Sequence, residues 1–219
     1  MMKVSIITSC TGKKTASPPN QLTQADFAKG ASHIRSREAE LAQWMRPAVA
    51  LYSGEQHVRL MRGVHAAREQ GAAVSVSILS AGYGLIPEEQ LIAPYEMTFN
   101  GMKKKESHAW ATMLGIRESI RAVLDTDADL VLILLGERYL QACGFDAITQ
   151  LRSPTWALCG TASAKQFSPA FQLVKLRQSD TSGYACGNIG LKGEVAARIL
   201  ENLHRGPDEA IRHVMALAA

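Results

Sequence analysis

Six consecutive aliphatic residues, Leu130 to Leu135, constrain the fold more than any other feature of the sequence. Asp129 precedes the run, and Gly136 and Glu137 follow it. The run is much shorter than the roughly 18 to 20 apolar residues that a membrane helix needs, whereas its length suits a fully buried strand. Strands buried on both faces are typical of parallel sheets covered by helices. The run therefore predicts the centre of an α/β fold.

Other short segments have the β-branched and apolar composition of strands. These segments are residues 4–7, 74–79, 155–158 and 171–176, the last of them expected at an edge of the sheet. Apolar residues at helical spacing lie between them, in residues 39–69 and 108–124. This alternation predicts right-handed βαβ units, a mostly parallel central sheet of four or five strands, and helices on both faces. We expect a single α/β domain over residues 1–219, in which residues 183–219 form a helical appendage.

The composition is that of a folded globular chain. Hydrophobic residues make up 47% of the sequence and charged residues 20%, which excludes a disordered protein. The net charge is only +4, so the field of the whole molecule attracts phosphates weakly. Local basic clusters therefore matter more than the total charge.

Cysteine usage bears on compartment and cofactors. Cys10, Cys143, Cys159 and Cys186 lack the paired spacing of a zinc site, and no secretory signal precedes them. We therefore expect reduced thiols and a cytoplasmic protein. The histidines have no ligand spacing with a cysteine or a carboxylate pair, so we expect no metal and no other cofactor. No apolar run is long enough to span a bilayer, so no membrane partner is expected.

Small, polar or glycine-rich loops follow four of the predicted strands. These loops are residues 9–14, 80–85, 136–139 and 160–166. In open sheets of this kind, ligands bind beyond the carboxyl ends of the strands. The loops meet at one edge only if their strands are parallel, which the pattern alone does not establish. The sequence therefore predicts a site built from loops, centred on the motif S-A-G-Y-G-L at residues 80–85.

The first loop carries two lysines. Its sequence T-G-K-K-T lacks the earlier glycine of a P-loop, and Lys14 stands where a P-loop has a hydroxyl residue, so an ATPase is excluded. Backbone N–H groups together with Lys13 and Lys14 still suit a phosphate or a nucleic-acid backbone, and a solvated turn is the alternative. Ser9 and Cys10 belong to the same candidate loop.

The motif S-A-G-Y-G-L places Tyr83 between Gly82 and Gly84. Glycine permits close approach of a ligand to the backbone, and an exposed tyrosine can stack on a base or a sugar. The alternative is a tight turn whose tyrosine packs over the core. Both interpretations stay open at this point.

A second aromatic residue and a carboxylate follow Pro94, at Tyr95 and Glu96. Glu96 is the best candidate for a general acid or base, and its alternative is a surface or helix-capping glutamate. Tyr52 begins another polar cluster, in which His57 is interpreted as structural.

Further candidates for binding phosphate are basic side chains elsewhere in the chain. Arg138 follows the central strand, and Lys165 lies in the fourth loop. Lys103 and Lys104 begin a lysine run, for which a solvated surface is the alternative interpretation.

Residues 187–193, with the sequence G-N-I-G-L-K-G, resemble the turn of a helix-hairpin-helix DNA-binding element. Such a turn directs backbone amides at a DNA phosphate from a helix N-terminus. Asn188 occupies the position of the first glycine of the usual triplet, and Gly193 stretches the alanine spacing. The resemblance implies DNA contacts through Asn188, Gly190 and Lys192.

Taken together, the lysine-bearing loop, the motif S-A-G-Y-G-L and the triplet P-Y-E resemble the peroxide-stress-resistance YaaA-like proteins. The hallmark of that family is roughly S-A-x-Y-G-L followed by P-Y-[DE], and the resemblance covers about the first 140 residues. It implies association with DNA through a fold related to those of DNA glycosylases. Some small proteins of prokaryotic anti-phage defence are DNA glycosylases that remove hypermodified bases, and the same activity is an expectation here.

Such an enzyme would assign roles to the candidate residues. Cleavage of an N-glycosidic bond builds positive charge on the sugar, so the site needs a nearby carboxylate and a pocket for an extruded base. Glu96 would supply the carboxylate, with Tyr83 and Ser80 as further catalytic candidates. Tyr83 and Tyr95 would stack on the flipped base, and Lys13 and Lys14 would clamp the flanking phosphates. The residues expected to bind substrate are Ser9, Cys10, Lys13, Lys14, Tyr52, Gly82, Gly84, Tyr95, Arg138 and Lys165.

Two other functions use the same features. A non-catalytic DNA-binding stress-resistance protein would keep the DNA contacts alone. A nucleoside N-glycosidase or deoxyribosyltransferase would need the same sugar chemistry but only a closed pocket. DNA is the expected partner in the first two cases, and a monomer is the working expectation for the oligomeric state.

Overall fold

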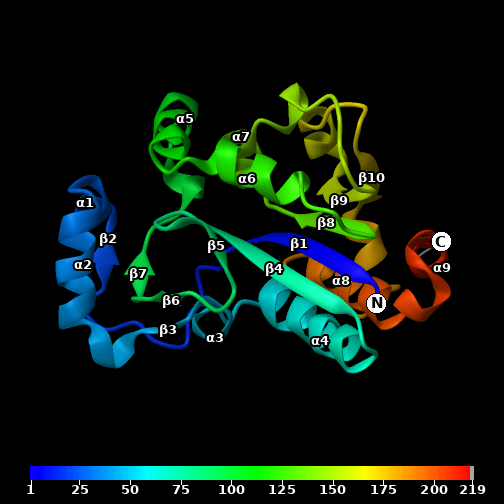
Figure 1. Ribbon diagram of the computed structural model, residues 1–219, viewed down its shortest axis with the longest axis horizontal. Helices are drawn as coiled ribbons and strands as arrows, with labels where there is room; N and C mark the ends of the chain where they lie inside the picture. The colour runs from blue at the N-terminus through cyan, green and yellow to red at the C-terminus, as the bar shows by residue number, and fades with distance from the viewer. Residues whose placement is uncertain (218–219) are drawn as a thin grey trace.

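A computed structural model describes residues 1–217 and places one six-stranded sheet between two layers of helices (Figure 1). The strand order is β10-β9-β8-β1-β4-β5. In chain order the strands are β1 (Lys3–Ser9), β4 (Ala73–Ser80), β5 (Gly84–Pro87), β8 (Leu130–Leu134), β9 (Thr155–Gly160) and β10 (Gln172–Leu176). The predicted α/β class, with a mostly parallel sheet, is confirmed.

The central and edge strands lie where the pattern predicts them. Every residue of β8 is buried, and this strand pairs in parallel with β1 on one side and β9 on the other. β10 pairs in parallel with β9 and ends the sheet. All four predicted loops therefore leave parallel strands and do meet at the same edge.

β5 is the strand that the sequence analysis missed. Gly84 has a φ of +76°, which closes a tight turn and returns the chain antiparallel to β4. Leu85 and Ile86 then face Leu79 and Ile78 across the pair. The central sheet therefore has six strands rather than four or five, and residues 84–85 of the predicted loop belong to a strand.

Nine α-helices accompany the strands in the part of the chain that the structure describes. They are α1 (Gln24–Ala28), α2 (Ala31–Glu40), α3 (Ala48–Leu51), α4 (Glu55–Glu69), α5 (Lys104–Met113), α6 (Ile116–Leu124), α7 (Glu137–Cys143), α8 (Leu191–Glu201) and α9 (Pro207–Ala216). Figure 1 shows α4 and α8 on one face of the sheet and α6 and α7 on the other. The predicted helix over residues 108–124 is divided at Gly115, whose φ of +60° ends one helix and starts the next.

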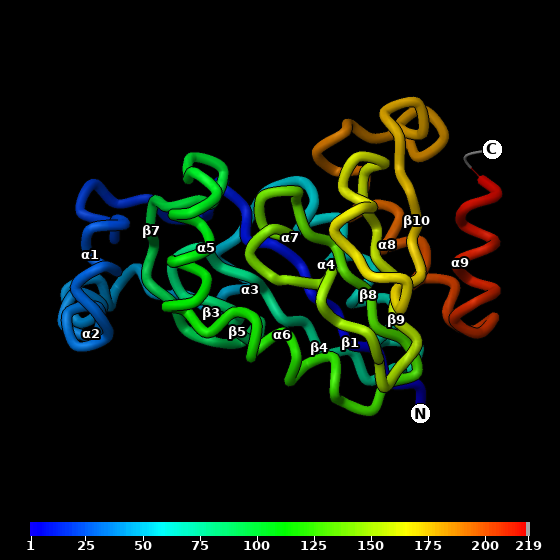
Figure 2. The backbone as a smooth tube through the Cα atoms, turned by 90° about the horizontal axis from the view of Figure 1, so that it is seen from above, coloured from blue at the N-terminus to red at the C-terminus, as the bar shows by residue number. Residues whose placement is uncertain are grey.

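Short elements complete the chain. The 3-10 helices are η1 (Ala42–Trp44), η2 (Phe99–Gly101), η3 (Phe145–Ala147), η4 (Thr161–Gln166), η5 (Gln178–Thr181) and η6 (Leu203–Arg205). The two-residue strands are β2 (Leu22–Thr23), β3 (Arg46–Pro47), β6 (Leu91–Ile92) and β7 (Tyr95–Glu96). β2 pairs with β7 and β3 with β6, so two small sheets join the segment that carries α1 and α2 to the rest of the molecule. Figure 2 shows α1 and α2 at one end of the molecule and α9 at the other.

Helices α4 and α8 approach each other at two glycines. A Cβ atom on Gly63 would lie 2.3 Å from Ala197 Cα, and one on Gly193 would lie 2.2 Å from the carbonyl oxygen of Gln56. No side chain fits at these distances, which explains Gly193 inside a helix despite its low helix propensity. The glycine therefore serves helix packing rather than the turn of a hairpin.

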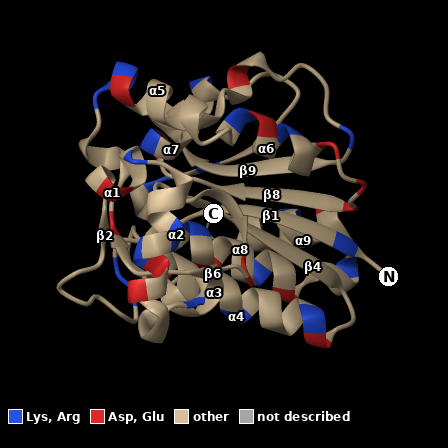
Figure 3. Cartoon of the chain, turned by 60° about the vertical axis from the view of Figure 1, so that its left-hand side comes forward, with Lys and Arg blue, Asp and Glu red and all other residues tan. Residues whose placement is uncertain are grey.

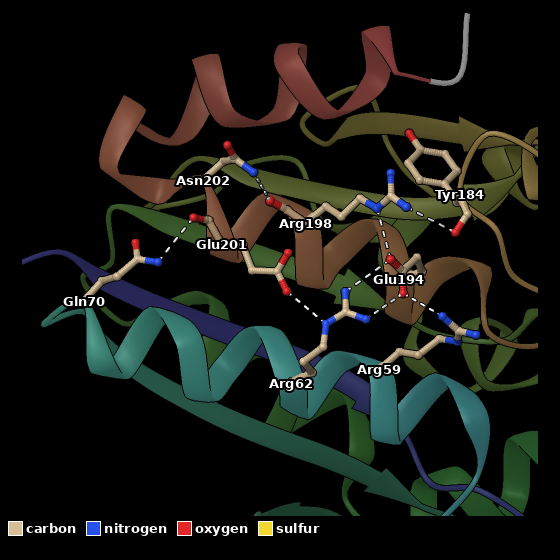
Figure 4. A network of polar contacts seen from close by, with 8 residues as sticks. All are labelled: Arg59, Arg62, Gln70, Tyr184, Glu194, Arg198, Glu201 and Asn202. Carbon is tan, nitrogen blue, oxygen red and sulfur yellow. Dashed lines mark hydrogen bonds and ion pairs between the residues drawn. The ribbon is translucent and has the colours of Figure 1, made fainter.

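A cluster of charges joins the same two helices (Figure 4). The Glu194 carboxylate is buried and accepts hydrogen bonds from Arg59, Arg62 and Arg198 at 2.7 to 3.2 Å. Arg62 also donates to Glu201 at 2.9 Å. Burial alone would raise the pKa of Glu194, but the hydrogen bonds from the three guanidinium groups outweigh it and lower the pKa to about 2.

The C-terminal segment is a layer of the domain. Leu191, Val195 and Ile199 of α8 are buried in the common core, and α8 covers the sheet beside α4. The described part of the predicted appendage is therefore an integral part of the fold, while residues 218 and 219 lie outside the described residues. No helix within residues 1–217 has the length and apolar character needed to cross a membrane.

Candidate functional site

The sheet changes winding direction between β1 and β8. These strands are neighbours, yet the crossover that follows β1 carries α4 on one face and the crossover that follows β8 carries α7 on the other (Figure 1). Helices diverging in this way leave a crevice at the carboxyl ends of the two strands. A cleft of about 410 Å³ lies there, lined by Ser9, Cys10, Thr11, Gly12, Lys13, Ser53, Gly54, Glu55, Gln56 and Ile189.

Hydrogen bonds fix the walls of this cleft. Thr11 Oγ1 accepts from the Gly54 N–H at 3.1 Å and donates to the Lys13 carbonyl at 2.8 Å. The Gln56 amide donates to Thr8 Oγ1 at 3.2 Å and to the Leu134 carbonyl at 3.0 Å. The first loop, the start of α4 and the ends of β1 and β8 are thus held together.

The start of α4 gives the cleft its electrostatic character. Gly54 is the N-cap residue and no side chain caps the helix, so the N–H groups of the first turn favour a negative ligand. Lys13 adds a positive charge to the wall, and Glu55 adds a negative one. The predicted phosphate-binding role of the first loop is compatible with this wall.

A chain of buried hydroxyl groups lies beneath the loops. Tyr95 Oη is 2.8 Å from Tyr52 Oη and 2.8 Å from Ser80 Oγ. Ser80 Oγ also accepts from the N–H groups of Gly82 and Tyr83, at 3.2 and 3.0 Å. Burial raises the pKa of both Tyr52 and Tyr95 well above the ordinary value, so these phenols stay protonated. We call Tyr52, Ser80 and Tyr95 the hydroxyl chain.

Tyr83 packs over the core. Its hydroxyl donates to Glu38 at 3.0 Å and accepts from the Ala93 N–H at 3.1 Å. Its ring meets the ring of Phe27 edge-on, with centroids 5.1 Å apart. A Cβ atom on Gly82 would lie 2.4 Å from the Phe27 ring, which explains the glycine. The interpretation of residues 80–83 as a tight turn is therefore the correct one.

The observed environments of these residues show that three predicted roles, in base stacking, catalysis and ligand contact, are wrong. Tyr95 is 0% exposed, so its ring offers no face to an extruded base, and the ring of Tyr83 is engaged in the same aromatic cluster. Ser80 is 0% exposed and bonded to the turn, so a catalytic contact with substrate is wrong. Gly84 shapes the hairpin, and its predicted contact with a ligand is wrong as well.

The structure does bring Cys10 and Glu96 close to Lys14, and of these three residues Cys10 lines the cleft. Lys14 Nζ lies 4.5 Å from the centroid of the Tyr95 ring and donates to the Gly12 carbonyl at 3.4 Å. Burial lowers the pKa of Lys14, and the nearby Cys10 and Glu96 raise it by less. Glu96 is exposed, and Cys10 Sγ lies 3.2 Å from Tyr139 Oη.

The remaining basic candidates do not join this cleft. Arg138 is exposed on α7. Lys104 and Lys165 line a second cavity, of about 950 Å³, and Lys103 is the N-cap residue of α5. Sequence reasoning missed Arg117 and His108 of the second cavity, because nothing in the chain around them signals a cavity.

The structure contradicts the helix-hairpin-helix interpretation. The segment before the turn, η5, is a single four-residue 3-10 turn, so the first helix of the hairpin is absent. Lys192 Nζ donates to the Leu135 carbonyl at 2.5 Å, and burial lowers its pKa, so the predicted DNA contact is wrong. Of the three residues predicted to contact DNA, Gly190 is buried against Arg59 and only Asn188 is exposed.

Two other predictions concern histidine and metal. His57 is buried, and its Nε2 lies 2.9 Å from the Val49 carbonyl, as expected of a structural histidine. Within residues 1–217, no group of three or more His, Cys, Asp or Glu side chains is placed to hold a metal ion. The absence of a cofactor stays a prediction.

An open sheet with a crevice where its winding reverses defines a doubly wound α/β protein. Within that class, residues 38–168 match the model of a family of unknown function, DUF6884. The match spans 131 residues (168 − 38 + 1) of 219, so the chain belongs to this family. It includes the hydroxyl chain but neither the first loop nor α8. No curated protein matches the chain, and the resemblance to the YaaA-like proteins stays a prediction.

Proposed function

We propose that the chain is a DNA N-glycosylase that flips out a modified base, favouring a hypermodified pyrimidine of phage DNA, and leaves an abasic site. The observation that carries the proposal is the proximity of Glu96 to Lys14, which directly follows the cleft residue Lys13 at the carboxyl ends of the strands. A carboxylate there would stabilise the positive charge that develops on the sugar, and an ammonium group would bind a flanking phosphate.

The state of Glu96 supports this role. The side chain is exposed and forms no ion pair within 4.0 Å with residues 1–217. Its carboxylate is therefore free to face a sugar or to orient a water molecule. Lys14 lies close enough to Glu96 for the carboxylate to raise the pKa of the Lys14 ammonium group, against the lowering by burial.

The cleft suits an extruded base. Its volume of about 410 Å³ is near the lower end of the range for small-molecule pockets, roughly 300 to 1,000 Å³. The wall has no aromatic ring, so recognition would depend on polar groups such as Ser9, Thr11 and Gln56. The hydroxyl chain would act as a rigid floor that positions these loops, rather than as a stacking surface.

The decisive experiment incubates the protein with phage DNA that carries hypermodified bases and with unmodified DNA, then measures alkali-labile sites. Glu96→Gln should lower the excision rate at least about 100-fold with DNA affinity unchanged, since general acid–base groups contribute roughly 10²- to 10⁴-fold. Glu89→Gln, another exposed glutamate, is the matched control and should keep full activity. A folded protein that binds every DNA tested and produces no abasic site on any of them would refute the proposal.

A nucleoside N-glycosidase or deoxyribosyltransferase is the second candidate, because a cleft of this size also holds a free nucleoside. Hydrolysis of mononucleosides without salt-dependent binding of long DNA would select it. A protein neutralising several phosphates loses affinity steeply as salt rises, and an enzyme that acts on small molecules does not.

A non-catalytic DNA-binding protein of the cytoplasm is the remaining alternative. An unchanged DNA-dependent phenotype in Glu96→Gln would favour it over both enzymes.

A further inference from the structure

We infer that the second cavity, between α5, α6, α7 and η4, binds phosphodiester groups of the nucleic-acid strand that enters the cleft. The cavity has a volume of about 950 Å³. Its lining residues are Lys104, Lys105, His108, Arg117, Glu137, Leu140, Gln141, Gly144, Asp146, Lys165 and Gln166. This inference rests on the proposed function, because the ligand is a continuation of the same DNA.

The charges of the wall favour an anion. Lys104, Lys105, Arg117 and Lys165 outnumber the carboxylates of Glu137 and Asp146, and His108 adds an imidazole. None of the four cations forms an ion pair within 4.0 Å in the part of the chain that the structure describes. Arg117 contacts only the ring nitrogen of His108, at 3.4 Å, among its hydrogen-bonding partners in residues 1–217. The arginines between α4 and α8, in contrast, all bond to Glu194.

The lysine run lies at the N-terminus of α5, the end of a helix that is less favourable for positive charge. Lys103 is the N-cap residue of α5, and Lys104 and Lys105 are its first two residues. The positive end of the helix dipole disfavours cations there. Glu106 in the same turn offsets only part of that charge. A bound anion would relieve this repulsion, which supports a ligand at this position.

The lining favours a phosphate backbone over a nucleobase. It contains no Phe, Tyr or Trp ring, and Leu140 is its one apolar side chain. A base held there would have only the imidazole of His108 as an aromatic stacking partner, whereas phosphates need only cations and amide donors. The cations come from three separate elements, α5, α6 and η4, which suits successive phosphates along a strand better than one compact group. Figure 3 shows basic positions along the side of the molecule that carries α5, α6 and α7.

Helix α7 connects the two cavities. Glu137 in its first turn lines the second cavity, and Tyr139 contacts Cys10 at the floor of the cleft. Lys165 follows β9 just as Lys13 follows β1, so both cavities lie beyond the carboxyl ends of parallel strands, the two that flank β8. A strand with one nucleotide in the cleft would therefore pass α7 and place its neighbouring phosphates in the second cavity.

The test compares two double variants with equal loss of charge. R117Q/K165Q removes two cations of the cavity. R121Q/K175Q removes two exposed cations outside it, of which Arg121 lies on the same helix as Arg117. Affinities for a labelled single-stranded oligonucleotide and for its duplex are measured between about 50 and 200 mM salt. Equal unfolding midpoints establish that all proteins are folded.

R117Q/K165Q should make the negative slope of log affinity against log salt shallower, by about 1.4 for the single strand or about 1.8 for the duplex, because each phosphate contact contributes about 0.7 or 0.9. R121Q/K175Q should keep the parental slope. If both variants keep it while the protein still excises a base, the inference is overturned and the proposed function stands. If the slope becomes shallower as expected but no DNA yields abasic sites, the proposed function fails and the inference stands. Binding of inorganic tripolyphosphate at these residues without any binding of DNA would overturn the assignment to a nucleic-acid strand.

Discussion

Tyr95 and Glu96 are adjacent residues with opposite environments. Tyr95 is wholly buried and Glu96 is exposed, because successive side chains of a strand point to opposite faces and both residues belong to β7. The sequence shows that the two residues are neighbours, but a strand of two residues has no pattern that tells which side faces inward. Both were therefore placed in the candidate site, and only Glu96 is open to a ligand.

The hydroxyl chain predicts unequal effects of two conservative substitutions. Tyr95→Phe removes both hydroxyl–hydroxyl bonds of the chain, to Tyr52 and to Ser80, so it should lower the free energy of unfolding by about 2 kcal/mol. Tyr52→Phe removes only one of the two bonds and should cost about 1 kcal/mol. Denaturant unfolding measures both. Equal losses, or a larger loss for Tyr52→Phe, would contradict the central position of Tyr95.

At the scale of elements, the close contact between α4 and α8 predicts that even a methyl group added there destabilises the protein. Gly63→Ala introduces a Cβ atom 2.3 Å from Ala197 Cα and should destabilise the protein by about 2 kcal/mol, although alanine is the better helix former. Gly101→Ala is the matched control, since nothing lies within 4 Å of its added Cβ atom, and it should leave the unfolding midpoint nearly unchanged. A neutral Gly63→Ala would show that the helices are further apart.

The charge cluster of the same helix pair predicts a pH dependence. The pKa of Glu194 is lowered to about 2, so its contribution is fully present above the ordinary value of 4.5 and is lost as pH falls toward 2. Glu194→Gln should cost about 2 kcal/mol at neutral pH, because three guanidinium groups lose a shared carboxylate. Glu201→Gln is the control and should cost less than about 1 kcal/mol, because Glu201 pairs with Arg62 alone and is more exposed.

The measurement is the unfolding free energy of the parent and of Glu194→Gln between neutral pH and pH 2. It tests whether the stabilisation by Glu194 decreases as pH falls. The difference in unfolding free energy should shrink below about pH 4.5. A difference that stays constant down to pH 2 would mean that Glu194 does not titrate in this window.

Pattern and composition predict the elements that are long and regular, and fail where tertiary contact decides. The all-apolar run of β8 needs burial on two faces whatever surrounds it, so its central place could be foreseen. β5 could not, because Gly84 permits either a loop or a hairpin, and β4 selects the hairpin. The role of Gly193 was likewise hidden, since its reason lies in the Gln56 carbonyl of another helix.

At the scale of the whole molecule, the large sheet and the α1–α2 segment should differ in local stability. β8 is buried throughout, whereas Ile34 is the one buried residue of α2, and two-residue strands join this segment to the rest. Amide hydrogen exchange should therefore be slowest in β1 and β8 and much faster in α2, since local opening follows the density of buried contacts. Uniform protection across both regions would contradict this division.

One end of the hydroxyl chain also has a fixed direction. Ser80 Oγ accepts two backbone N–H groups, which occupy both of its lone pairs, so its own proton is directed to Tyr95 Oη. Tyr95 Oη keeps one lone pair and its own proton for the bond with Tyr52 Oη, in which either hydroxyl can donate. The backbone of one tight turn thus fixes the orientation of the O–H group at one end of the hydroxyl chain, that of Ser80.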